Sequence, residues 1–223
     1  MAVINLVKVQ PIKHAMKVQK HDGAVAIITF ALTLVMAPHL EKSIIVGVLL
    51  SLGLYLYRSM RPRFSELSIH SDGTFRDAAV HNLQRCKHIS VLRLDVSLYF
   101  ANAVYFETKV LQNVASKPEQ KFVVLDLEGV NEIDATGEEV IGNLHERLGQ
   151  GGVRVLIARP KRQTMQIMDR SGLADEIGRE HFFRTRTDAI EYARAQLGDE
   201  VVDDSPLNPV KSTRRMRLEP QTS

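Results

Sequence analysis

The sequence predicts an α/β domain preceded by a short helical hairpin embedded in a membrane. Apolar residues concentrate in two runs between residues 24 and 57, whereas short β-rich runs alternate with amphipathic helical patterns after residue 62. That alternation is typical of a mixed, largely parallel sheet covered by helices. The 223 residues, 44% hydrophobic and 25% charged, suffice for one packed domain plus a smaller element and exclude a wholly disordered chain.

The apolar runs span residues 24–36 and 43–57 and flank a short polar break. Each run is shorter than the roughly 20 residues of a straight transmembrane helix. The second run has no charged residue and is apolar around most of a helix, which favours a membrane hairpin over a helix pair buried in a soluble protein. Lysines precede the pair and arginines follow it, so the positive-inside rule places both ends in the cytoplasm. Residues 1–23 are the basic lead-in.

The α/β domain is expected to begin near Phe64, because Pro62 ends a helix and forces the residue before it to be extended. Strands are expected at residues 64–70, 89–95, 122–127 and 153–158. Helices are expected at residues 101–115 and 136–148, around Met165 and Met168, and at 187–197 after an N-cap at Thr187. Residues 198–223 carry charge clusters and prolines without apolar periodicity, which predicts a disordered tail after a domain of residues 64–197.

Catalytic, metal-binding and nucleic-acid-binding patterns are absent from the sequence. It has no common phosphate-binding loop, nucleophile elbow, zinc-helix motif or CxxC pair, and its eight histidines include no i,i+4 pair. Cys86 is the single cysteine, which excludes a disulfide framework. The positive charges are scattered rather than gathered in one block. We therefore expect no enzyme activity, no cofactor, no metal site and no nucleic-acid partner.

One segment, residues 122–144, predicts a strand, a tight connection and a helix start containing Asp134, Thr136 and Gly137. A phosphate on Thr136 would lie at a helix N-terminus, where free backbone N–H groups favour an anion. Thr136 also begins an S/T-x-x-E pattern, so a capping box explains it without any regulation, and the two glutamates after Gly137 would repel a phosphate. Capping is the favoured interpretation, and phosphorylation stays open beside it.

A second candidate is the basic loop with Arg159, Lys161 and Arg162, directly after the fourth expected strand. Ligands of α/β proteins often bind at the carboxyl end of the sheet, so these charges suit an anion or a lipid headgroup. A solvated loop is the favoured interpretation.

The segment around Thr136 resembles the STAS domain, named for sulfate transporters and anti-sigma factor antagonists. In the antagonist branch the matching loop is a D-S-S-G stretch whose second serine is phosphorylated by a partner kinase, and Thr136 holds that position. Leu98, Tyr99, Phe100 and Asn102 lie in a stretch that resembles the LYFANA segment of STAS domains attached to SulP-family anion transporters. On their residue types, Leu98 and Phe100 are expected to pack in the core and Asn102 to stabilise the helix start.

The apolar runs resemble the last membrane segments of SulP transporters, and VINLV at residues 3–7 resembles the end of the preceding membrane helix. The resemblance covers about residues 3–197. It implies the C-terminal regulatory and assembly portion of a sulfate-like secondary anion transporter, with a cytoplasmic STAS domain that contacts the missing transport domain or a homodimer partner. Two short apolar runs cannot build an alternating-access site, so transport by this chain alone is not expected. The alternative is a membrane-anchored STAS signalling protein switched by a regulatory kinase at Thr136.

Overall fold

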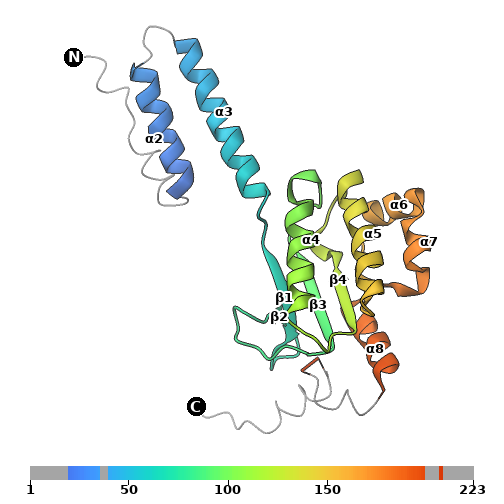
Figure 1. Ribbon diagram of the computed structural model, residues 1–223. Coiled ribbons are helices and arrows are strands. Elements are labelled where there is room, and N and C mark those ends of the chain that lie inside the picture. The colour runs from blue at the N-terminus through green and yellow to red at the C-terminus, as the bar shows by residue number, and fades with distance from the viewer. Residues whose placement is uncertain (1–19, 36–39, 199–205, 208–223) are drawn as a thin grey trace, which may run out of the picture. The chain divides into compact units, whose positions relative to one another are not determined.

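The computed structural model describes residues 20–35, 40–198 and 206–207, and the chain divides into two compact units between Ser59 and Met60. The first unit contains helix α2 (Lys20–Val35) and helix α3 (Leu40–Ser59), which pack against each other (Figure 1). Gly47 permits the close approach, because a Cβ there would lie 2.6 Å from Cγ2 of Thr29. Within these described ranges, no helix combines the length and the apolar character needed to cross a membrane. The membrane hairpin stays a prediction, and nearly all of the lead-in at 1–23 lies outside the described residues.

The second unit is built on a mixed six-stranded sheet in the order β2-β1-β3-β4-β5-β6. Strands β3 to β6 run parallel, whereas β1 pairs antiparallel with both β2 and β3. The strands are β1 (Phe64–Ile69), β2 (Phe75–Asp77), β3 (Ile89–Leu94), β4 (Phe122–Asp126), β5 (Arg154–Ala158) and β6 (Phe182–Phe183). The mixed, largely parallel α/β sheet expected from the sequence is confirmed. The short strands β2 and β6 were not predicted, since two or three residues carry no period-2 pattern.

Helices cover both faces of this sheet, and α4 and α5 lie side by side (Figure 1). The longer helices of the unit are α4 (Phe100–Ala115), α5 (Ala135–Gln150), α6 (Arg162–Ser171) and α8 (Arg186–Leu197), and shorter ones are η2 (Leu127–Gly129), α7 (Leu173–Ile177) and η3 (Arg179–His181). Alternate residues of β4 point to opposite faces: Val123 and Leu125 pack under α4 to α7, and Phe122 and Val124 pack under α8. All five residues of β4 are buried, so it is the centre of the core.

The expected N-cap at Thr187 is wrong. Thr185 caps α8 instead, because its backbone is extended and its hydroxyl accepts a hydrogen bond from the Asp188 N–H at 3.1 Å, whereas residue 187 is already helical. From the predicted tail, Leu207 is buried within the apolar cluster between α8 and the sheet. Residues 199–205 and 208–223 of that tail lie outside the described residues.

Candidate functional site

The connections that follow β3 and β4 run side by side and bring the two predicted segments together. Leu98 and Ile133 form a parallel β-bridge, the Leu98 N–H donates to the Glu132 carbonyl at 3.0 Å, and the Asp134 N–H donates to the Leu98 carbonyl at 3.2 Å. This bridge continues the β3–β4 pairing beyond the strands themselves. The starts of α4 and α5 therefore lie next to each other at the carboxyl edge of the sheet.

The Asp134 carboxylate caps both helices. Its Oδ1 accepts a hydrogen bond from the Gly137 N–H in α5, and its Oδ2 accepts one from the Phe100 N–H at the start of α4, each at 2.8 Å. A helix N-terminus leaves backbone donors unpaired and favours negative charge, so one carboxylate here satisfies two such ends. We call the residues Asp134, Phe100 and Gly137 the shared cap.

Gly137 has no room for a side chain. A Cβ at this position would lie 2.7 Å from the Leu98 carbonyl oxygen and 2.9 Å from Leu98 Cγ. The glycine that the sequence places three residues after Asp134 is therefore required by the close approach of the two connections rather than by its backbone conformation.

The Leu98–Asn102 segment is partly as expected. Leu98 and Asn102 are fully buried, and Asn102 accepts a hydrogen bond from the Tyr99 N–H at 3.1 Å and donates one to the Ser97 carbonyl at 3.0 Å. Asn102 thus stabilises the helix start. The expectation for Phe100 is wrong: it is 67% exposed, because it is the first residue of α4 and turns its side chain outward. Val104, one turn later, is 69% exposed. Phe100 and Val104 form what we call the apolar pair.

Thr136 is the second residue of α5 and is partly exposed. The capping box expected there is wrong, since the N-cap is Asp134, whose extended backbone can aim its carboxylate at the Gly137 N–H. A phosphate on Thr136 would lie at the same helix end as the Asp134 carboxylate, and the two negative groups would repel each other. Phosphorylation of Thr136 stays a prediction.

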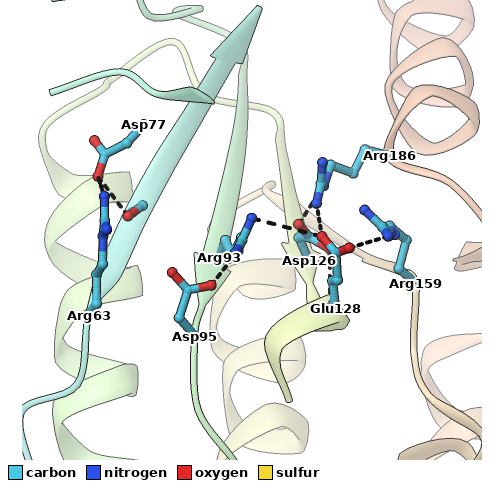
Figure 2. Close-up of polar contacts among 9 residues, drawn as sticks. Arg63, Asp77, Arg93, Asp95, Asp126, Glu128, Arg159 and Arg186 are labelled. Carbon is cyan, nitrogen blue, oxygen red and sulfur yellow. Dashed lines mark hydrogen bonds and ion pairs between the residues drawn. The ribbon is translucent and has the colours of Figure 1, made fainter. Parts of the chain in front are cut away.

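A chain of alternating charges lies along the same edge of the sheet (Figure 2). Asp126, at the end of β4, is fully buried, and its Oδ2 lies 2.5 Å from Nε of Arg186 at the start of α8. Arg186 also pairs with Glu128, which in turn pairs with Arg159. Arg93 joins this chain with Nη1 at 3.8 Å from Glu128 Oε2. These contacts join the end of β3, the turn after β4, the residue after β5 and the start of α8.

Sequence reasoning missed this chain of charges. Arg186 lies 60 residues from Asp126 in the sequence, and no local spacing connects them. A usable signal was present in Asp126 itself, since a carboxylate that ends a fully apolar strand needs a cationic partner when it is buried.

The basic loop predicted as an anion contact is partly neutralised. Arg159 pairs with Glu128, the Lys161 ammonium donates to Oδ1 of Asn131, and Arg162 begins α6 with its side chain exposed. In the part of the chain that the structure describes, no three His, Cys, Asp or Glu side chains are gathered as a metal ion would require.

Asp77, on β2, forms a separate polar contact with the start of β1 (Figure 2). Its Oδ2 accepts hydrogen bonds from the Ser65 hydroxyl at 2.8 Å and from Nη2 of Arg63 at 3.3 Å, and its Oδ1 accepts from the N–H groups of Ala79 and Val80. Burial alone would raise the pKa of Asp77, but the hydrogen bonds from Ser65, Val80, Arg63 and Ala79 outweigh it, and the pKa lies below its ordinary value of 3.8.

The chain is similar in sequence to proteins of known family. Residues 81–189 match the STAS domain. The probable sulfate transporter 3.5 of Arabidopsis thaliana is 27% identical over 203 residues, covering 88% of this chain and 31% of the relative. The high affinity sulfate transporter 2 of Stylosanthes hamata is 24% identical over 200 residues, covering 85% of this chain and 30% of the relative. The chain spans about a third of the length of these relatives.

A solved structure with the same fold is that of the murine Slc26a9 anion transporter in the inward-facing state. Its TM-score is 0.75 at 21% identity, and the match covers 83% of this chain and 30% of that chain. The likeness concerns the fold.

Proposed function

We propose that the chain, whose residues 81–189 match the STAS domain, is the C-terminal regulatory and assembly portion of a SulP-type secondary anion transporter. One observation carries the proposal. Alignments with sulfate transporters cover 85–90% of the chain, so they must include residues before the STAS match as well as the domain itself. A free-standing STAS protein would share the domain alone.

The exposed apolar surface of the first unit supports a membrane setting. Ile44, Val48 and Leu52 on α3 are each more than half exposed, and α2 exposes Ile27 and Ile28 to nearly the same degree. Contiguous apolar surface of this kind marks a protein or membrane contact. We infer that lipid and the remainder of the transport domain cover it, with the STAS domain and both termini on the cytoplasmic side.

The role proposed for the STAS domain is association rather than chemistry. The shared cap holds α4 and α5 in one arrangement, and the apolar pair beside it presents an exposed surface to a transport domain or to a second protomer. Such a contact regulates transport only if it differs between two conformations of the transporter. The chain alone is not expected to transport, because alternating access needs a binding site between repeats. Sulfate is the anion named for the relatives, and we propose a sulfate-like anion here.

An immunoblot of membranes and cytosol from the source cells, with an antibody to residues 64–197, tests the proposal. We expect a membrane band far larger than a 223-residue chain, because the domain would belong to a complete transporter. A membrane band of the size of this chain, with no larger product, would contradict it. Extraction with alkaline carbonate should leave the band in the membrane pellet, whereas release would contradict the membrane setting.

A second candidate function is a membrane-anchored STAS switch phosphorylated at Thr136 by a serine/threonine kinase. The observation in its favour is that Thr136 is partly exposed on the first turn of α5, where a kinase can reach it. Phosphopeptide mapping of the chain from source cells separates the two functions. Stoichiometric phosphate on Thr136 together with a product of the size of this chain would support the switch.

A further inference from the structure

A groove of about 390 Å³ lies where β5 and β6 end. It is lined by Arg159, Pro160, Phe182, Phe183 and Arg184. The carboxyl ends of parallel strands are the usual position of ligand sites in open α/β sheets. β6 is the edge strand of the sheet, so within the described residues no further strand covers this side of the groove.

Arg159 is held in place at the groove. Its backbone N–H donates to the Phe183 carbonyl at 2.8 Å, and its guanidinium pairs with Glu128. The backbone of Arg159 has a φ of 56°, a left-handed conformation that is costly for a residue other than glycine. Backbone strain of this kind clusters at binding sites, where the surrounding structure enforces it. The position of the guanidinium is therefore set before any ligand arrives.

Arg184 supplies a second cation with no compensating charge. Its side chain is exposed, and among the described residues it makes no ion pair. Glu128 compensates Arg159, and Arg186 is compensated by Asp126 as well, so of the two arginines that line the groove only Arg184 adds uncompensated positive charge.

The remaining walls are apolar. Phe182 and Phe183 are adjacent residues of β6, so their rings leave the strand on opposite sides, and both are only partly buried. Phe183 is partly supported by Tyr192, with ring centroids 5.3 Å apart. Phe182 packs in part against the apolar cluster under α4 to α7 and Phe183 against the cluster under α8, so the two residues line the groove from opposite faces of the sheet.

We propose that this groove binds a phosphate group carried on an apolar organic body. A planar guanidinium matches two phosphate oxygens at once, so Arg159 and Arg184 take the phosphate, and the uncovered parts of the two phenyl rings flank the organic body from either side of β6. An anionic lipid headgroup and a soluble phosphate ester share this chemistry. The proposal goes beyond the docking role of the STAS domain and does not depend on it.

Isothermal titration of the full chain tests the groove with two probes: phenyl phosphate in solution, and phosphatidate in phosphatidylcholine vesicles. The variant Arg184→Gln removes one cation from an exposed side chain, so it should fold as the parent does. The control Arg154→Gln makes the same charge change at the opposite end of β5, where the side chain is also exposed. We expect Arg184→Gln to bind at least about tenfold more weakly, since a lost charge-assisted hydrogen bond has that effect, and Arg154→Gln to bind as the parent does.

Binding of phenyl phosphate without binding of phosphatidate vesicles would identify a soluble ester as the source, and the reverse would identify a lipid. Equal loss in Arg184→Gln and Arg154→Gln would show general charge attraction and overturn the proposal. Inorganic phosphate that binds as tightly as phenyl phosphate would also overturn it, because the phenyl walls would then contribute nothing. If neither probe shows saturable binding, the proposal is also overturned.

Discussion

Asp134 shows how much a single residue can organise. Both of its carboxylate oxygens are used, one for the first turn of α4 and one for the first turn of α5. Gly137 allows the connections after β3 and β4 to approach each other, so the shared cap depends on both Asp134 and Gly137. Thr136, which the sequence pattern favours as the cap, plays no part in it.

Asp134→Ala should lower the free energy of unfolding by about 1–4 kcal/mol, since each lost cap costs about 0.5–2 kcal/mol. Asp134→Asn keeps one accepting oxygen and should cost roughly half as much. Urea unfolding of the full chain, followed by circular dichroism, measures both variants. Thr136→Ala is the control and should change stability little. An equal cost for Thr136→Ala and Asp134→Ala would contradict the shared cap.

The stability contributed by Asp77 should depend on pH. Because folding lowers its pKa, the contribution is present above the ordinary value of 3.8 and is lost as the pH falls through the folded value. Asp77→Asn should therefore destabilise the chain at about pH 6 and show a smaller difference from the parent at about pH 3. Urea unfolding at the two pH values makes the comparison. A difference that grows as the pH falls would mean that the sign is wrong.

Among the elements, the strands and helices with strong periodicity were the predictable part of the fold. Strands β1, β3, β4 and β5 and helices α4 and α5 begin or end within one or two residues of the expected positions, because apolar spacing determines which face is buried. The shared cap and the pairing of Asp126 with Arg186 were not predictable. Both depend on which loops the fold brings together at one edge of the sheet. The spacing of residues in the sequence does not indicate which loops these are.

The Asp126–Arg186 pair joins β4 to α8 in a buried setting. Arg186→Met should cost about 3–5 kcal/mol, because it leaves the buried Asp126 without its cation. Adding Asp126→Leu to Arg186→Met should restore a large part of that stability, since an apolar pair carries no desolvation cost. Chemical unfolding of the single and double variants tests the difference. A double variant less stable than the single one would contradict this account.

The exposed face of α4 should matter to transport and not to folding. Phe100→Ser combined with Val104→Ser removes the apolar pair, so the proposed function predicts lower anion uptake, measured with sulfate, by cells whose full-length protein carries the change. The unfolding of the chain should change little, because both side chains are more than 60% exposed. Val80→Ser is a matched control, since Val80 is 66% exposed but lies outside α4. Equal uptake by both variants would argue against the docking role.

At the scale of the whole molecule, the chain consists of two units that differ in how they bury apolar surface. The second unit closes two apolar clusters on either side of its sheet. The first exposes large apolar residues on both of its helices. The second unit is therefore the part expected to fold by itself, and Leu207 belongs to its core although it follows α8 by ten residues.

A fragment of residues 60–223 should unfold in one cooperative transition. A fragment of residues 60–198 lacks Leu207 and should be less stable by about 2–5 kcal/mol, as for the loss of other buried leucine side chains. Thermal unfolding of the two fragments measures the difference, with Leu207→Ala in the longer fragment as the matched substitution. Equal midpoints for both fragments would show that Leu207 does not belong to the folded unit.

The shared carboxylate also couples the opening of the first turn of α4 to the opening of the first turn of α5. Since Phe100 and Gly137 donate to the same side chain, rotation of Asp134 releases both amides at once, and neither helix frays from this end independently. We therefore expect the first turns of these two 16-residue helices to open together rather than one at a time.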